Sequence, residues 1–304
     1  MLSITLVVFF LAFAVGLAMV TVPSKPNVLT TVSALLEKYK SQIAAALPKH
    51  MTPERMIRVA LTSISQTPLL QKCEATTLCG AVVQASILGL EPNSVLGECY
   101  IVPYWNSKAN RYEAQLQVGY KGHAKLARNS GEIAMIDAQA VRANDDFMFE
   151  KGDSPTLRHK WAKSGTRGDV LGYWAGFKTR AGDFSFEYWP LEDVIAHRDQ
   201  YSKGAYATDR GKRVMKDGKP VLQGAWAESP DWMCKKTVLI QALKLAPKSV
   251  QMATAINLDQ DADLGVPQQF QPEVPLELQP AAEVVDAAPA PDAEGQPVQE
   301  TLKV

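Results

Sequence analysis

The chain has 304 residues, enough for one large domain or two small ones with a packed core, and its formal net charge is zero. The charge is uneven: residues 1–258 carry 31 basic and 22 acidic side chains, whereas residues 267–304 carry seven acidic residues, one lysine and seven prolines. A basic body with an acidic, proline-rich tail favours a polyanionic partner such as nucleic acid. Four cysteines without a CxxC pair and four scattered histidines exclude a zinc finger, and they favour free thiols in a reducing, cytoplasmic compartment.

The first 20 residues are almost wholly apolar, and no charge precedes Lys25. This length matches a bilayer-spanning helix. The run also resembles the core of a secretory signal, although the positively charged start is missing. A misassigned start is the third explanation, because Met19 opens a polar leader. We favour the misassigned start and keep the membrane anchor and the signal peptide as alternatives.

Three helices are predicted next. The first spans residues 29–47. The second begins with Thr52 as N-cap and Pro53 at its first helical position, the residue types that helix starts prefer. The third carries an apolar face and stops at Gly89, since glycine accepts the left-handed conformation of a helix end.

Strands and helices then alternate. Residues 97–105 and 111–119 flank the polar turn NSKAN and predict a hairpin, and residues 170–189 predict a second hairpin around RAGD. A helix and a further strand lie between the two hairpins, and another helix follows Pro190. Helices followed by mixed strands and helices indicate an α+β fold rather than a wound parallel sheet.

The C-terminal part changes in composition. Residues 201–223 hold too many glycines and charges for a regular element and predict a long mobile loop. The last strong helix is predicted from Ser229 to Ala246, and disorder is expected beyond residue 258. The predicted domains are therefore a leader over 1–27, a core over 28–258 and a disordered acidic tail over 259–304.

The segment LQVGYKGHAKLARNSG, residues 116–131, concentrates positive charge. In a helix that begins near Gly122, Lys121, Lys125 and Arg128 fall on one side, where like charges four residues apart repel. No acidic residue follows on that face to relieve them. A helix start between Gly119 and Gly122 also presents free N–H groups and the positive end of the helix dipole. Because glycine has no side chain, an anion could approach the backbone closely there. The sequence therefore predicts an anion site here.

Further basic and aromatic residues favour nucleic acid as that anion. Lys235 and Lys236 lie in the last helix, with Lys244 two turns beyond Lys236 on the same face. Basic residues also occupy a strand end and the long loop: Arg142, Lys203, Arg210, Lys212 and Arg213. Interleaved aromatic residues that could stack on bases are Tyr104, Trp105, Tyr112, Tyr173 and Trp174. For any single residue, solvated surface or ordinary core is the simpler explanation, but the set favours binding of a nucleic-acid backbone.

Two classes of enzyme fit less well. The nearest approach to a P-loop, around Lys212, lacks the first glycine and the magnesium-binding hydroxyl, so an ATPase is rejected. A nuclease would need clustered carboxylates to hold a divalent metal. The candidates, Asp145 with Asp146 and Asp183 with Glu187, are commonplace turn and edge acids.

Several segments match a known pattern. They are AAALPKHMTPERMIRVA at 44–60, VVQASILGLEP at 82–92, QLQVGYKGHAKLARNSGEI at 115–133 and VRANDDFMFE at 141–150. The spacing of Gly224, Trp226, Met233 and the KKT of 235–237 belongs to the same pattern. On these segments the chain resembles the RecT family of phage-type single-strand DNA annealing proteins, over roughly residues 40–256.

The resemblance implies an α+β fold with a Rad52-like curved antiparallel or mixed sheet, two hairpins and flanking helices. It implies a DNA-repair recombinase without ATPase or nuclease activity, which binds single-stranded DNA and the annealed duplex as a homo-oligomeric ring or filament. A partner exonuclease, a host single-strand-binding protein and the cytoplasm of a bacterial host are implied as well. No cofactor would be required, with Mg²⁺ acting as a DNA counterion. The predicted groove residues are Gln117, Tyr120, Lys121, Lys125, Arg128, Arg142, Lys203, Lys235 and Lys236.

Some features depart from the family pattern. A basic pair often follows KKT four residues on, but here those positions hold Ile240 and Gln241. The long basic loop 201–223 could compensate, in which case its deletion would weaken DNA binding and flatten the salt dependence. The acidic tail could compete with DNA, dock partners or act as a solubilising segment. Alternatives from other classes are a metal-dependent nuclease and a membrane-tethered nucleic-acid-binding module.

Overall fold

The computed structural model describes residues 27–49, 51–209 and 212–268. Residues 1–26 of the predicted leader and residues 269–304 of the acidic tail lie outside the described residues, as does Arg210. None of the helices in the described part of the chain is long and apolar enough to cross a bilayer.

The helices are α1 (Val28–Lys38), α2 (Lys40–Ala46), α3 (Pro53–Gln66), the 3₁₀ turn η1 (Leu70–Lys72), α4 (Ala75–Leu88), α5 (Tyr120–Asn129), α6 (Leu191–Tyr201), the 3₁₀ turn η2 (Lys203–Ala205), α7 (Gly224–Glu228), α8 (Pro230–Leu243) and α9 (Val250–Leu264). The strands are β1 (Cys99–Asn106), β2 (Arg111–Val118), β3 (Ile133–Arg142), β4 (Asp146–Glu150), β5 (Thr156–Lys160), β6 (Val170–Thr179), β7 (Phe184–Pro190), β8 (Thr208–Asp209), β9 (Lys212–Arg213), β10 (Met215–Lys216) and β11 (Lys219–Pro220).

The N-terminal helices follow the local signals of the sequence, with one break. The Thr52 side chain caps α3, and Pro53 is the first helical residue, as predicted. α4 ends at Gly89, whose φ of 65° is left-handed, which confirms that prediction too. The single helix predicted over 29–47 is wrong, because the chain forms α1 and α2, which meet at Tyr39. Neither glycine nor proline marks this break, so no local signal predicts it.

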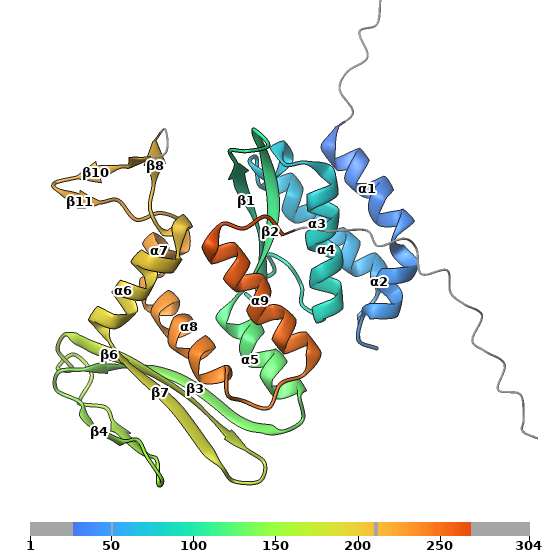
Figure 1. Cartoon of the computed structure of the whole chain (residues 1–304). Helices are drawn as coiled ribbons and strands as arrows, with labels where there is room; N and C mark the ends of the chain where they lie inside the picture. The colour runs from blue at the N-terminus through green and yellow to red at the C-terminus, as the bar shows by residue number, and fades with distance from the viewer. Residues whose placement is uncertain (1–26, 50, 210–211, 269–304) are drawn as a thin grey trace, which may run out of the picture. The chain divides into compact units, whose positions relative to one another are not determined.

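Both predicted hairpins are present, as β1–β2 and β6–β7. β6 is the central strand of an antiparallel sheet in the order β3–β6–β7 (Figure 1). α8 lies against all three strands of this sheet. A hairpin that the sequence did not predict, β4–β5, also packs on the sheet: the Phe147 and Tyr188 rings have centroids 4.9 Å apart, and the Trp174 indole donates to His159 at 2.9 Å. The α+β class is thus confirmed, whereas the Rad52-like curvature stays a prediction.

The C-terminal part departs most from the prediction. α8 ends at Leu243, three residues before the predicted end at Ala246. A further helix follows, α9, whose N-cap Ser249 accepts a hydrogen bond from its first turn. The expected disorder beyond residue 258 is wrong for residues 259–264, which complete α9 and include Asp259 with only 3% of its surface exposed. The aspartates of this stretch resemble an acidic tail in sequence, but the fold buries one of them.

The described residues of 201–223 contain regular elements, so the prediction that no such element forms there is wrong. After η2 the chain forms two short hairpins, β8–β9 and β10–β11. The Ala207 N–H donates to the Val221 carbonyl at 2.9 Å and joins the two. We call the described residues of 206–222 the arm, which extends from the region of α7 (Figure 1). Its exposed basic residues are Lys212, Arg213, Lys216 and Lys219.

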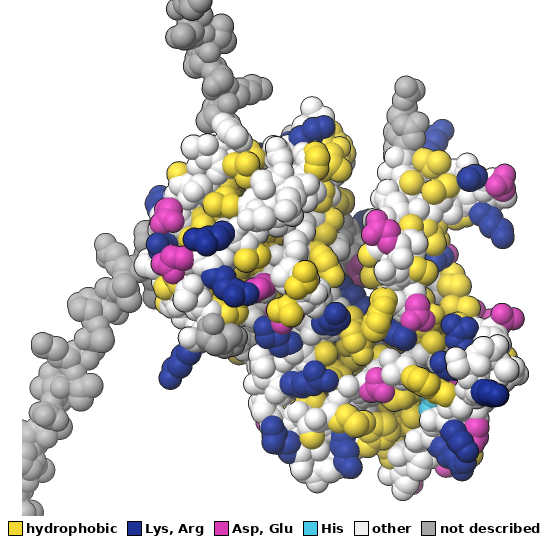
Figure 2. Space-filling view, turned by 180° about the vertical axis from the view of Figure 1, so that it is seen from behind, with side chains coloured by type: hydrophobic (Ala, Val, Ile, Leu, Met, Phe, Trp, Pro, Cys, Tyr) yellow, Lys and Arg dark blue, Asp and Glu magenta, His cyan; other side chains and the backbone are white. Residues whose placement is uncertain are grey.

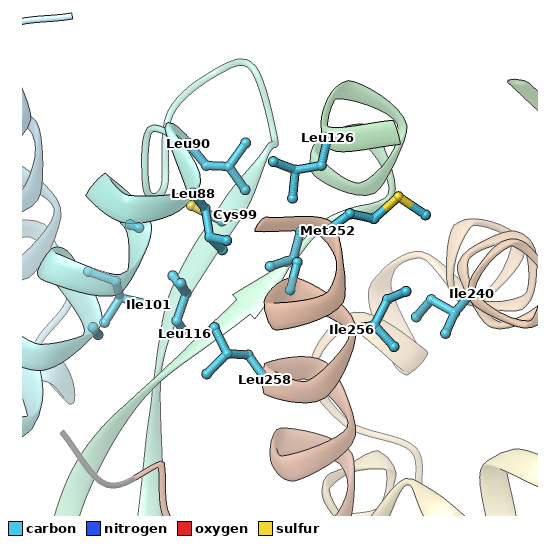
Figure 3. Packing of buried hydrophobic residues seen from close by; sticks show 14 of the residues in the cluster. Leu88, Leu90, Cys99, Ile101, Leu116, Leu126, Ile240, Met252, Ile256 and Leu258 are labelled. Atoms are coloured by element: carbon cyan, nitrogen blue, oxygen red, sulfur yellow. The ribbon is translucent and has the colours of Figure 1, made fainter. Parts of the chain in front are cut away.

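α9 completes the hydrophobic core, as Figure 3 shows. Leu258 points toward Leu116 of β2 and Ile101 of β1, whereas Ile256 points toward Ile240 of α8. All five side chains are 8% exposed or less. Burying an aliphatic side chain of this size contributes about 1.5–3 kcal/mol, so these contacts hold α9 between the β1–β2 hairpin and α8.

Candidate nucleic-acid interface

A cavity of about 620 Å³ lies between two walls. The β1–β2 hairpin and the start of α5 form the first wall, where Gln117, Tyr120 and Lys121 line the cavity. Helices α7 and α8 form the second wall, where Trp232 and Lys236 line it. Residues predicted from separate segments of the sequence therefore face one space.

A second cavity, of about 530 Å³, continues along α5. Lys121, Lys125 and Arg128 all line it, which confirms that they share one side of the helix. Val95, Tyr120 and Lys121 line both cavities, so we describe the two together as the groove. Lysine and arginine side chains are spread over the face of the molecule in Figure 2, with apolar side chains between them.

Two glycines allow the loop before β1 to approach α5. A Cβ on Gly122 would lie 2.1 Å from the backbone oxygen of Glu98, and one on Gly119 would lie 2.5 Å from that of Gly97. The Gly119 N–H also donates to the Glu98 carbonyl at 2.8 Å. The space expected to admit a phosphate is thus filled by protein backbone, so an anion here would have to be bound by side chains instead.

Lys125 has an acidic partner that the sequence did not reveal. Its Nζ lies 2.9 Å from Glu98 Oε2 and donates to the Gly89 carbonyl at 3.0 Å. As the sequence indicates, no acidic residue of α5 relieves this face, but a loop supplies one for Lys125. Lys121 and Arg128 are exposed and form no ion pair within the described residues. They are the two charges of this face that remain available to an anion.

The two lysines of α8 also have acidic partners. Lys235 Nζ lies 2.8 Å from Asp231 and 4.7 Å from the centroid of the Trp232 ring. Lys236 Nζ lies 2.9 Å from Asp259 Oδ2. Each lysine side chain is only 13% exposed. A phosphate at either lysine would meet the aspartate as well, so each attracts DNA less than a free lysine does.

Asp259 joins four elements beside the groove. Its Oδ2 contacts both His123 of α5 and Lys236 of α8, and its Oδ1 accepts the Val118 N–H of β2 at 2.9 Å. Burial raises the pKa of Asp259, but Lys236 and His123 outweigh burial and hold the pKa below its ordinary value. We call His123, Lys236 and Asp259 the Asp259 cluster. Its charge pairing fixes α9 and Lys236 relative to the hairpin wall.

An aromatic pair joins the two walls of the groove. The Tyr120 and Trp232 rings have centroids 5.3 Å apart, and burial raises the pKa of the Tyr120 hydroxyl. Trp232 nevertheless keeps 50% of its surface exposed, and Tyr100, which lines the same cavity, keeps 43%. Exposed rings beside cations are suited to stacking on unpaired bases.

Comparison with known proteins assigns the chain to a family. A family model described as "RecT family" matches residues 54–273. Protein RecT of Escherichia coli (strain K12) is 34% identical over 229 residues, which cover 75% of this chain and 78% of that protein. This chain belongs to the RecT family. An uncharacterized protein of Bacillus subtilis (strain 168), YqaK, is 25% identical over 253 residues, covering 79% of this chain and 72% of that protein. RecT-family proteins anneal single strands in DNA recombination, which places the chain in that functional class rather than among classical enzymes.

The nine residues predicted for the RecT-type groove are not all brought together. Six line it: Gln117, Tyr120, Lys121, Lys125, Arg128 and Lys236. Lys235 lies beside Trp232 without lining the groove. Arg142 ends β3, where its guanidinium donates to the Gly168 carbonyl at 3.0 Å. Lys203 is exposed on η2, at the base of the arm.

The two residues of α8 that depart from the RecT-family pattern both contact other parts of the protein. Ile240 is buried, and the Gln241 amide lies 3.4 Å from His197 of α6. Sequence reasoning missed Trp232 and Asp259. Trp232 stands four residues before Lys236 on the same helix, a spacing that could have placed it in the groove. No local signal marks Asp259, since its partners come from α5 and α8.

The predicted stacking aromatics have different surroundings. Tyr173 and Trp174 are 4% and 7% exposed in the sheet, so they belong to the core. Trp105 is 46% exposed and packs edge-on against Tyr112 with centroids 4.9 Å apart. None of these four lines the groove.

The carboxylates considered for a nuclease have other partners. Asp145 is buried against Arg167 and His159, and Arg167 holds the pKa of Asp145 far below its ordinary value. Glu187 pairs with Lys151 at 2.7 Å. Among residues 27–49, 51–209 and 212–268, no group of three or more His, Cys, Asp or Glu is arranged to hold a metal ion.

Proposed function

We propose that this protein binds single-stranded DNA along the groove and anneals complementary strands without ATP, acting as an oligomer. One observation carries the proposal: the exposed cations Lys121 and Arg128 share a groove with exposed aromatic and apolar side chains, among them Trp232 and Val95. Cations attract phosphates, and aromatic rings accept the face of any base. This combination is typical of proteins that bind single strands of any sequence.

Backbone binding also explains how such a protein would anneal DNA. Contacts to phosphate carry no sequence information, so the pairing edges of the bases stay free for a second strand. The stability of the product comes from base pairing and requires no ATP. Several subunits in a ring or filament would align their grooves and hold one strand extended. Mg²⁺ would serve as a counterion that screens the repulsion between strands.

The proposed biological setting follows from the family. An exonuclease partner would expose the single strand, and a host single-strand-binding protein would be displaced from it. The bacterial cytoplasm, with its reducing conditions, suits the four cysteines, all of which are free and buried.

An annealing assay tests the proposed function. Two complementary oligonucleotides carrying donor and acceptor dyes are mixed with the protein in EDTA, without ATP. We expect pairing to be faster than without protein by about tenfold or more, because a basic groove concentrates strands locally. A denaturing gel of the same samples, with and without added Mg²⁺, should show intact strands. Strand loss with Mg²⁺ would favour the nuclease alternative, and intact strands without faster pairing would contradict the proposal.

A further inference from the structure

A third cavity, of about 430 Å³, opens between α6, α8 and α9. Met233 and Lys236 line both this cavity and the groove, so the two adjoin along α8. Its volume falls in the range of about 300–1,000 Å³ that is usual for small-molecule sites. We call it the aromatic pocket and define it by Trp189, His197, Tyr201, Trp226, Gln241 and Asp263.

Aromatic rings form one side of this pocket. His197 lies between Trp189 and Tyr201, with ring centroids 5.4 Å and 4.7 Å away. Tyr201 keeps 40% of its surface exposed, although it lines a pocket rich in apolar groups. Rings placed in this way offer a stacking surface to a flat, aromatic ligand.

Among the described residues, the Asp263 and Gln241 side chains of the pocket each have a single, long hydrogen bond. The Ser202 hydroxyl donates to Asp263 Oδ1 at 3.4 Å, and the Gln241 amide lies 3.4 Å from His197 Nε2. Both distances are longer than ordinary hydrogen bonds, which fall near about 2.7–3.2 Å. Burial raises the pKa of Asp263 to about 6. A ligand with its own donors and acceptors would satisfy these groups, whereas a hydrocarbon ligand would leave them poorly bonded.

We propose that the aromatic pocket binds one nucleobase of the DNA strand whose phosphates lie in the groove. The inference rests on the proposed function, because the base belongs to the bound strand. The face of the base would stack on the rings, its edge would meet Asp263 and Gln241, and Lys236 at the junction would lie near the adjoining phosphate. An apolar side chain from a second copy would suit the rings but not the two polar groups. A base that leaves the stack to enter this pocket interrupts the row of stacked bases, and the bases on either side of it stay free to pair.

The test compares two strands and two variants of the full chain. One strand carries bases, and the other has the same length and dye but base-free sugars throughout. Tyr201→Ala removes an exposed ring of the pocket, and Trp161→Ala removes an exposed ring outside it, 56% exposed beside Arg167. We expect Tyr201→Ala to weaken binding of the base-containing strand about tenfold, the usual scale of one base–ring stack, and binding of the base-free strand less than about twofold. Trp161→Ala should change neither affinity.

Each other outcome is informative. Equal losses on both strands, or none, would overturn the base-binding proposal. A lower oligomeric state of Tyr201→Ala with unchanged base preference would show that a second copy occupies the pocket. Gln241→Trp, which fills the pocket from α8, should reproduce the base-selective loss if the variant unfolds at the wild-type denaturant concentration. Failure of the wild type to bind either strand would instead contradict the proposed function.

Discussion

Replacing Asp259 with asparagine is expected to lower the free energy of unfolding by about 3–5 kcal/mol, the usual cost of removing one partner of a buried ion pair. Asparagine has the same shape and can still accept the Val118 N–H, but it removes the carboxylate with which Lys236 forms its ion pair. Asp259 is 3% exposed and Lys236 13% exposed, so water compensates this loss poorly. Urea unfolding, followed by circular dichroism, measures the change.

Asp261→Asn is the matched control, because Asp261 lies two residues away on α9 and makes no ion pair with any described residue. Its stability should stay within about 0.5 kcal/mol of wild type, as for most surface substitutions. The loss of stability at acidic pH is a second measurement of the same contribution. The folded pKa of Asp259 is lowered, so its contribution is full above the unfolded value of about 3.9 and is lost as the pH falls through the folded pKa. Asp259→Asn should therefore lose less stability on acidification than wild type, and wild-type stability of the variant at neutral pH would refute the role of the cluster.

Replacing Lys121 and Arg128 together with alanine is expected to weaken single-stranded DNA binding about 10- to 100-fold at low salt, because two phosphate contacts are lost. The slope of log K against log salt should fall by about 1.4, at about 0.7 for each phosphate contact to a single strand. Stability should change little, since both side chains are exposed and unpaired within the described residues. Fluorescence anisotropy over a salt series gives both numbers.

The matched control removes one arginine and one lysine elsewhere. Arg58 on α3 and Lys72 on η1 are exposed and line neither part of the groove. The Arg58→Ala/Lys72→Ala variant has the same net charge as the groove variant, so a general effect of charge would appear in both. An unchanged salt slope in the groove variant, or an equal change in the control, would show that α5 is not part of the DNA interface.

Local signals explain what the sequence could predict. The Thr52–Pro53 start of α3, the glycine end of α4 and the polar turns of two hairpins depend on neighbouring residues, and all agree with the structure. The shared face of Lys121 and Arg128 follows from helical spacing alone. The RecT-type motifs predict which wall of the fold carries the site, and this assignment stays a prediction.

Long-range contacts explain what the sequence could not predict. Lys125 is not a free charge, because Glu98, 27 residues earlier in the chain, pairs with it. The sequence predicts that the acidic tail begins at Asp259, since nothing near this residue shows that His123, 136 residues away, pairs with it in the core. Gly119 and Gly122 predict space for a phosphate, whereas the backbone of Gly97 and Glu98 fills that space. In each case the deciding partner lies in another element.

Binding of DNA in this groove would make the rate of annealing depend on Lys121 and Arg128. The rate of ATP-free pairing of two dye-labelled complementary oligonucleotides is compared between wild type, Lys121→Ala/Arg128→Ala and Arg58→Ala/Lys72→Ala at equal protein concentration. We expect rapid pairing by wild type and by the control, and a rate near that of protein-free strands for the groove variant. A folded groove variant that pairs the strands as fast as wild type would contradict this expectation.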